Sequence, residues 1–177
     1  MADRSMHPWL RGPVQGVPAP LWPVAHALQQ TLEEATEFVE GFPDDLLWEP
    51  VAGLATVGFH LRHIAGVIDR LFTYARDEQL TDEQRTAARN ESVPPPPDAP
   101  TSVAELLAGV VEAVDRALDQ LRATDPATLT DTRYIGSKRI PSTVMGSLFH
   151  AAEHSQRHVG QLLVTARVLC DERGALD

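Results

Sequence analysis

The chain has 177 residues, of which 43% are hydrophobic and 23% charged, and these proportions are typical of one globular domain. Its formal net charge of -10 would repel a phosphate backbone, so we expect no nucleic acid partner. The longest uncharged run, residues 12–32, contains four prolines, and residues 1–20 lack the apolar core of a signal peptide, so we expect no membrane partner. The single cysteine, Cys170, permits no intrachain disulfide and fits a reducing cytoplasm, which is the expected location.

The 14 prolines cluster between long proline-free windows at residues 24–42, 51–93, 101–125 and 142–177. Because proline breaks helices, this distribution is typical of helices joined by proline-marked turns. Residues 1–19 carry proline and glycine without apolar periodicity, which predicts an N-terminal arm laid on the surface. Residues 20–177 are then expected to form a single domain.

The first two helices are predicted on either side of a proline-containing turn. The first begins near residues 20–23 and ends at Gly41, because proline suits a first helical turn and glycine suits the position beyond a helix end. The second begins after Thr56, a good N-cap residue, and runs to about Asp77. Charged residues recur every seven positions along it, at Arg62, Asp69 and Arg76. This side of the second helix is therefore predicted to face solvent.

A long connection, residues 78–100, separates the second and third helices and contains four consecutive prolines near its end. Such a run favours an extended conformation, which would carry the chain across the end of a bundle and let the two helices run parallel. The polar part of this connection, residues 81–90, is predicted to form a short surface helix. The third helix, about residues 101–122, opens at Thr101 or Ser102, with Glu105 placed for a capping box.

The fourth helix is predicted to start after Pro141 and to continue to about Cys170. The connection before it, residues 125–141, contains basic residues and forms the most positive rim of an acidic protein. No alternating apolar pattern of useful length predicts a strand. The fold is therefore predicted to be all-α, a four-helix bundle with a long connection between the second and third helices.

Five of the seven histidines lie on two of the predicted helices. They are His60 and His63 on the second helix, and His150, His154 and His158 on the fourth. At about 100° per residue, the second helix turns both of its histidines towards the bundle, so periodicity does not choose between them. On the fourth helix, the same rotation turns His154 and His158 inward and leaves His150 at the boundary.

Inward histidines have two explanations. A buried histidine taken alone is usually a hydrogen-bonded core residue. Several together gain little as neutral rings and repel one another when protonated, so a shared metal ion explains the group best. A zinc protease motif is absent, because Ser155 follows His154 where that motif has glutamate. Asp69 and Arg70 are expected to be an exposed charged pair.

Two segments around these histidines are similar to a known family. They are Thr56-Val-Gly-Phe-His-Leu-Arg-His63-Ile-Ala-Gly and His154-Ser-Gln-Arg-His158-Val-Gly-Gln161. Together they resemble the DinB-like superfamily, the DinB/YfiT-type metalloenzymes, over about residues 20–170. The resemblance implies a four-helix bundle with a long second connection, and it implies a homodimer.

The resemblance also assigns roles to individual residues. It implies three metal ligands, namely His63, His154 and His158. His60 would then be a neighbour of the site that hydrogen-bonds a ligand or lines the pocket. Gln161 is implied to pack behind the last ligand or to support it. No role follows for His26 and His150, which we expect to be partly exposed or hydrogen-bonded.

The chemistry that the resemblance implies depends on the number of ligands. Three neutral imidazoles leave at least one coordination position open, whereas a structural site has four protein ligands. A water or a low-molecular-weight thiol would lose its proton there, and S-transfer to a small-molecule substrate or hydrolysis would follow. The reacting group would then be the water or thiol rather than a side chain. Zinc, nickel and iron all suit three histidines.

The alternative is a non-catalytic protein, a dimeric metal-binding or stress-response module built on the same bundle. A fourth protein ligand, or a pocket sealed by Phe59, Tyr74 or Phe149, would favour this alternative. An open coordination position would favour an enzyme.

Overall fold

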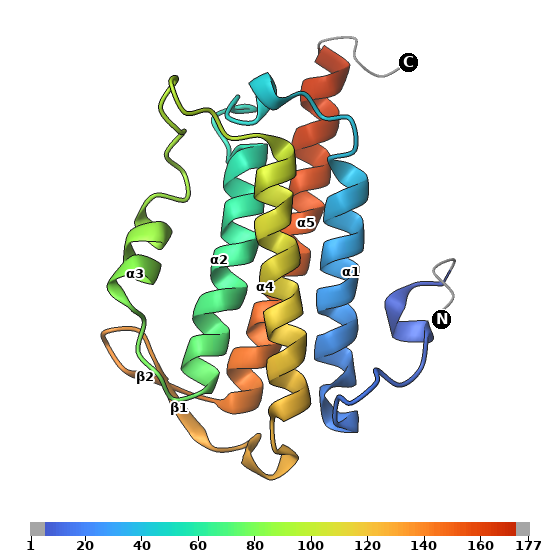
Figure 1. Ribbon diagram of the computed structural model, residues 1–177, viewed down its shortest axis with the longest axis vertical. Coiled ribbons are helices and arrows are strands. Elements are labelled where there is room, and N and C mark those ends of the chain that lie inside the picture. The colour runs from blue at the N-terminus through green and yellow to red at the C-terminus, as the bar shows by residue number, and fades with distance from the viewer. Residues whose placement is uncertain (1–5, 173–177) are drawn as a thin grey trace.

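The fold is a bundle of long helices with one short helix outside it (Figure 1). The computed structural model describes residues 6–172. The long helices are α1 (Trp22–Phe38), α2 (Val57–Ala75), α4 (Val103–Ala123) and α5 (Val144–Glu172), and the short one is α3 (Asp82–Arg89). The predicted all-α class is confirmed. The described residues form five helices rather than four because the polar part of the long connection folds into α3, as its sequence predicts.

A small antiparallel hairpin, β1 (Thr132–Ile135) and β2 (Ile140–Thr143), joins α4 to α5. The expectation that the chain has no strand is therefore wrong. Each strand has four residues, which is too short for an alternating pattern to stand out in the sequence. The turn between the strands begins at Gly136, whose φ of 68° is in the left-handed region that favours glycine.

Side-chain caps fix where two of the long helices begin. The Thr56 hydroxyl accepts a hydrogen bond from the backbone N–H of Phe59 at the start of α2. At the start of α4, Ser102 and Glu105 form the predicted capping box, which decides between the two candidate N-caps. Such caps satisfy N–H groups that have no partner within the helix, and each stabilises it by about 1 kcal/mol.

The long connection makes α2 and α4 run parallel, as predicted (Figure 1). In the view of Figure 1 the chain descends α2, returns upward through α3 and the proline run at residues 94–97, and then descends α4. Helix α2 packs against both α4 and α5, and α1 packs against the same two helices. As a result α2 and α5 are direct neighbours that run in opposite directions.

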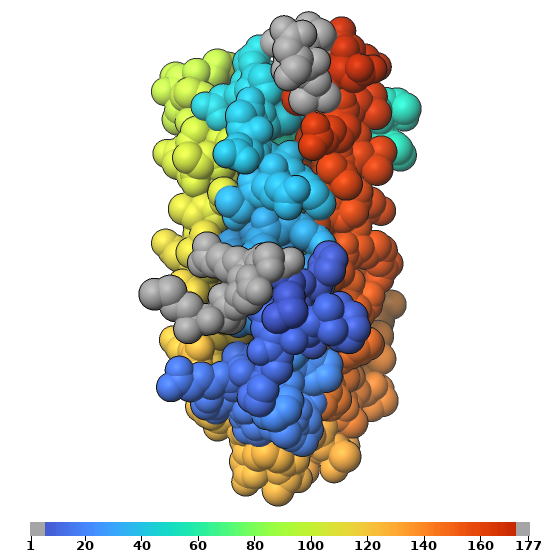
Figure 2. Space-filling model, turned by 90° about the vertical axis from the view of Figure 1, so that its right-hand side faces the viewer, coloured from blue at the N-terminus to red at the C-terminus, as the bar shows by residue number. Residues whose placement is uncertain are grey.

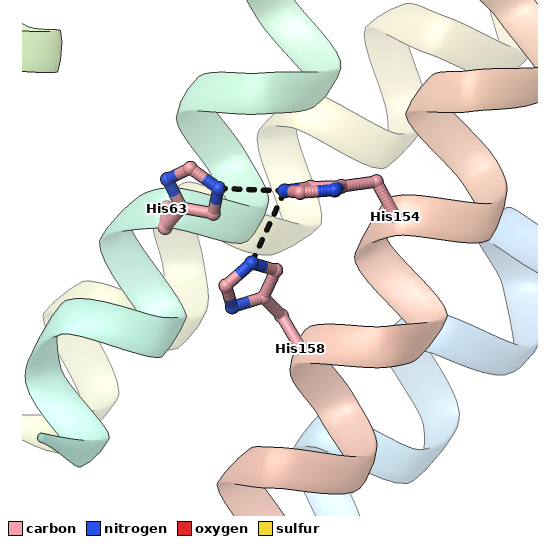
Figure 3. Close-up of side chains that lie close together, drawn as sticks. All are labelled: His63, His154 and His158. Carbon is pink, nitrogen blue, oxygen red and sulfur yellow. Dashed lines mark hydrogen bonds between the residues drawn. The ribbon is translucent and has the colours of Figure 1, made fainter. Parts of the chain in front are cut away.

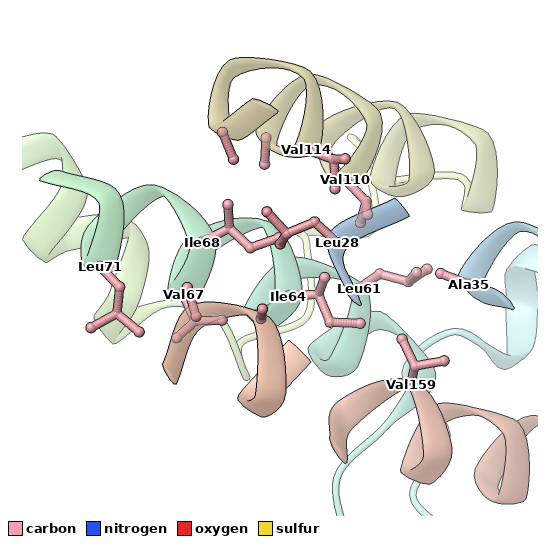
Figure 4. Packing of buried hydrophobic residues seen from close by; sticks show 14 of the residues in the cluster. Leu28, Ala35, Leu61, Ile64, Val67, Ile68, Leu71, Val110, Val114 and Val159 are labelled. Atoms are coloured by element: carbon pink, nitrogen blue, oxygen red, sulfur yellow. The ribbon is translucent and has the colours of Figure 1, made fainter. Parts of the chain in front are cut away.

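Aliphatic side chains from all four long helices fill the centre of the bundle (Figure 4). Fully buried examples from α1, α2, α4 and α5, in that order, are Leu28, Leu61, Val110 and Val159. Burial of each such side chain stabilises the fold by roughly 1.5–3 kcal/mol. This core sets the spacing of α2 and α5, and with it the distance between the histidines that the two helices carry.

The described part of the predicted arm lies against α1 (Figure 2). Arg11 forms an ion pair with Glu33 of α1, and the His26 side chain donates through Nε2 to the Gly12 carbonyl at 2.9 Å. Val17 is buried in the core. His26 is therefore a hydrogen-bonded structural residue. Residues 1–5 of the arm and residues 173–177 lie outside the described part of the chain, and the domain boundary at residue 20 stays a prediction.

The charged side of α2 is exposed at Arg76, as predicted, but it is partly covered at Arg62 and Asp69, contrary to the sequence-based expectation. Gln84 of α3 donates to the Asp69 carboxylate at 2.7 Å, and Arg70 forms an ion pair with Glu91. Arg62 is half-buried. Asp69 and Arg70 are therefore not an exposed pair. The long connection and α3 pack over this side. The seven-residue spacing of charges within α2 could not predict this, because it carries no information about the path of the connection.

None of the helices described within residues 6–172 is long and apolar enough to cross a membrane.

We expect Gly58→Ala to destabilise the protein by about 1–3 kcal/mol, because a Cβ atom there would lie 2.8–2.9 Å from ring carbons of Trp48. Gly109→Ala, in the interior of α4, is the matched control. A Cβ at Gly109 meets nothing within 4 Å, so this change should stabilise the helix by about 0.5–1 kcal/mol. Urea unfolding measures both free energies. Equal stability of Gly58→Ala and the wild-type protein would contradict the close packing of Trp48 on α2.

Candidate metal centre

Three histidine side chains converge between α2 and α5 (Figure 3). His63 comes from α2, and His154 and His158 come from successive turns of α5. The Nε2 atom of His154 lies 2.9 Å from Nε2 of His63 and 3.1 Å from Nε2 of His158. The family resemblance implied these three residues as one group, and the structure brings them together.

The donor atoms of this group fit a small divalent cation. A neutral imidazole carries one proton, so three Nε2 atoms that face one another cannot all be satisfied by mutual hydrogen bonds. Zinc binds imidazole nitrogen at about 2.0–2.1 Å, and tetrahedral ligands at that distance lie about 3.3 Å apart. The observed separations of 2.9 and 3.1 Å are close to this value.

Burial keeps the imidazoles of His60, His154 and His158 neutral, which is the form that binds metals. Burial, aided by the nearby charge of His63, lowers the pKa of His158 to about 3. Burial, again aided by His63, lowers the pKa of His60 to about 4. The pKa of His154 is lowered for the same two reasons. These side chains therefore present lone pairs rather than positive charges at neutral pH.

Glu91 supports His63 from outside the cluster, and the sequence did not point to it. Its carboxylate, 7% exposed, accepts one hydrogen bond from His63 Nδ1 at 2.7 Å and another from Arg70 at 2.5 Å. Because the His63 proton is on Nδ1, its Nε2 lone pair points to His154. Carboxylate–histidine pairs of this kind orient metal ligands and raise their basicity.

Gly66 is the sequence signal that could have revealed Glu91. A Cβ atom at this position of α2 would overlap Glu91 Oε1 and the Arg70 guanidinium. Glycine in a helix interior costs about 1 kcal/mol relative to alanine, so its presence there calls for a packing reason. The close approach of the Glu91–Arg70 pair to the α2 backbone is that reason.

The remaining histidines near the cluster differ in their surroundings. His60 is buried, and its Nδ1 lies 3.0 Å from Nδ1 of His158. His150 is exposed, and its Nδ1 lies 2.6 Å from Glu153. Phe59 stacks on the His63 ring with centroids 5.1 Å apart. Gln161 is exposed on α5, one turn after His158.

A second set of donors overlaps the first. His150, Glu153 and His154 also bring one donor atom each within 4.8 Å of one another. This set shares His154 with the first, lies on one stretch of α5 with His150 exposed, and already satisfies itself through the His150–Glu153 contact. All three members of the first set are half-buried and join two helices, and unpaired lone pairs cost more free energy as burial increases. We therefore take His63, His154 and His158 as the candidate metal centre.

The chain is similar to one family of known proteins. A model of the DinB superfamily matches residues 27–162, well over half of the chain, and the protein belongs to this superfamily. The superfamily is generally metal-binding, and the histidine cluster provides a candidate site for such a metal. The search of curated proteins gave no match to this chain.

The lowered pKa values predict how the stability of the metal-free protein depends on pH. His60 and His158 titrate at about 4 and 3 in the folded state and near the ordinary value of 6.5 in the unfolded chain. Between about pH 6.5 and 4 the unfolded state therefore binds more protons, so the free energy of unfolding should fall as the pH falls through this window. Urea unfolding in a chelator, at half-unit steps of pH, measures the slope.

The slope should correspond to uptake of at least about two protons on unfolding, since the pKa of His154 is lowered too, and His60→Gln should reduce it by about one. A free energy of unfolding that does not change between pH 6.5 and 4.5 would show that these imidazoles are not held neutral by the fold.

Proposed function

We propose that the protein is a metal-dependent enzyme in which His63, His154 and His158 hold one divalent transition metal and leave a coordination position open. The observation that carries this proposal is the convergence of three Nε2 atoms at 2.9 and 3.1 Å. Among residues 6–172, no fourth His, Cys, Asp or Glu donor joins this set. Three protein ligands are typical of catalytic sites, and four are typical of structural ones.

The metal would supply one kind of chemistry, which is to lower the pKa of a water or thiol that shares its coordination. The protein's own residues would prepare the site for it. Glu91 holds the proton of His63 on Nδ1, and His60 contacts His158 on the side away from the cluster. The neutral state of the buried rings keeps their lone pairs available at physiological pH.

For the reaction, we propose thiol-dependent S-transfer or hydrolysis on a small-molecule substrate, as in the enzymes that the sequence resembles. The reacting group is then an external thiol or water, and a low-molecular-weight thiol is the proposed co-substrate. Zinc, nickel and iron are equally compatible with three imidazoles. The cytoplasmic location and the homodimer expected from the sequence are part of this proposal.

One observation favours the alternative, a non-catalytic dimeric metal-binding or stress-response module. A metal held by His63 on α2 and by two residues of α5 would cross-link the two helices and stabilise the bundle. Phe59, stacked on His63, covers one side of the cluster. Phe149 is exposed and Tyr74 is buried in the core, and neither ring stacks on the three histidines. We still propose an enzyme, because three protein ligands for the metal leave a coordination position open.

The ligand assignment predicts a graded series of metal affinities. Replacing His154 and His158 with alanine should abolish stoichiometric transition-metal binding, whereas His26→Ala should leave it unchanged. Glu91→Gln should weaken metal binding by about 10–100-fold, because it removes the charge that orients His63. Elemental analysis after dialysis against limiting zinc measures the metal content, and circular dichroism checks that each variant is folded.

His150→Ala separates the two overlapping donor sets in the same experiment. It should retain the metal if His63, His154 and His158 are the ligands. Loss of metal in His150→Ala together with retention in His158→Ala would reject the proposed site and select the set that contains His150.

The proposed activity predicts a rate that requires both metal and thiol. The metal-loaded protein should accelerate the conjugation of small thiols with chlorodinitrobenzene, in which a carbon–sulfur bond forms, chloride leaves and the thiol proton passes to the buffer. The controls are the chelated wild-type protein and the His154→Ala, His158→Ala variant, neither of which should accelerate it. Metal-dependent ester cleavage without thiol would select the hydrolase. No metal-dependent rate in either assay would favour the non-catalytic module.

A further inference from the structure

A groove of about 430 Å³ opens beside the candidate metal centre, between the segment that leads into α2 and the second half of α5. It contains His60, which contacts the proposed ligand His158. It also contains Arg157 and Gln161 of α5, the residues immediately before and three after His158. The groove is therefore next to the cluster along α5, and its chemistry indicates what binds there.

His60 provides the buried polar group of this groove. The side chain is 3% exposed, and its Nδ1 is directed to His158 Nδ1 at 3.0 Å. Its other nitrogen, Nε2, is consequently turned away from His158. Within the described residues this Nε2 atom has no hydrogen-bond partner. It is accessible to solvent, whereas Nδ1 of His154 is fully buried without a partner. Because His60 lines the groove, Nε2 is the nitrogen that a ligand there can reach.

A metal on the cluster determines which kind of hydrogen bond His60 offers. A cation bound by His158 through Nε2 leaves the His158 proton on Nδ1. This Nδ1–H then donates to His60 Nδ1, and the His60 proton has to be on Nε2. His60 therefore presents an N–H donor to the groove whenever the metal is bound. This step depends on the proposed function.

The other polar side chains of the groove, Arg157, Gln161 and Thr165, can all donate hydrogen bonds. The Arg157 guanidinium has Glu153 as its partner, at 3.4 and 3.5 Å, so most of its N–H groups remain available. The Gln161 amide is exposed and has no hydrogen bond within the described part of the chain. No Asp or Glu from residues 6–172 lines the groove. In a protein with a net charge of -10, this groove is suited to a negatively charged group.

The rim of the groove is apolar. Leu54, before α2, is 69% exposed, and Val164, on α5, is 62% exposed, and both line the groove. Large aliphatic side chains that project into solvent beside a polar floor are typical of a ligand site that takes a hydrocarbon group. The groove thus combines one positive charge and further donors with an apolar surface.

We propose that this groove binds a small monocarboxylate with an apolar body, and that this is the substrate class of the proposed enzyme. The carboxylate oxygens accept hydrogen bonds from His60 Nε2–H, Arg157 and Gln161, and the hydrocarbon body packs on Leu54 and Val164. His60 is a binding residue that also senses the metal, because its donor state is set through His158.

Hexanoate and hexanamide test the charge recognition, since they share one hydrocarbon chain and differ at the carboxylate. Calorimetric titration of the zinc-loaded protein should show tighter binding of hexanoate. Arg157→Gln should weaken hexanoate binding about tenfold and leave hexanamide binding unchanged. Arg167→Gln, which removes the same charge from an exposed position of α5 outside the groove, should have no effect. Equal hexanoate affinity in the two variants would overturn the proposal.

Nitrogen NMR of the imidazoles tests the link to the metal. In the zinc-loaded protein the His60 proton should be on Nε2, and hexanoate should shift that resonance. A His60 proton on Nδ1 in the zinc-loaded protein would overturn the role of His60. Zinc content, measured on the same samples, distinguishes failure of the proposed metal-dependent function from failure of the proposed carboxylate site. If the wild-type protein holds no zinc, the proposed function fails, and the Arg157→Gln comparison with the metal-free protein then decides the groove alone.

Discussion

The arrangement of the whole protein depends on the contact between α2 and α5. This contact places Nε2 of His154 2.9 Å from Nε2 of His63 and 3.1 Å from Nε2 of His158, in a half-buried position. Facing lone pairs in a region of low dielectric gain nothing from one another, and only a cation or a shared proton compensates them. The apolar core fixes the distance between the two helices, so the same packing that stabilises the bundle also keeps the donors in place.

The two sides of this contact receive different support. On one side, Glu91 arrives from the long connection and holds His63 through Nδ1. On the other, His60 meets His158 through the same kind of nitrogen. The Glu91–His63 and His60–His158 contacts both leave Nε2 of the proposed ligand directed to the centre of the cluster. The position of each ring and the choice of the ring nitrogen that carries the proton therefore both organise the site. The protein belongs to the DinB superfamily, which is generally metal-binding, and these histidines are its candidate metal site.

Much of this could be predicted from the sequence because the relevant signals are local. The N-caps Thr56 and Ser102 and the inward turn of the histidines follow from spacing within one helix. The place of Glu91 could not be predicted, because it depends on the path of a connection that returns along α2. The covering of Asp69 by α3 was missed for the same reason. The hairpin was missed because four-residue strands carry too little periodicity.

The attachment of Glu91 to α2 divides the long connection into two parts with different freedom to change in length. Residues 76–90 have to span from the end of α2 back to the level of His63 and Arg70, so an added or deleted residue there would pull the carboxylate out of register with both partners. Arg62 of α2 also holds the Val93 carbonyl, so residues 94–101, which include the proline run, only have to reach the start of α4 from a point that is already anchored. Among relatives, variation in loop length should therefore be concentrated after the glutamate. The part of the loop before the glutamate has to keep its length.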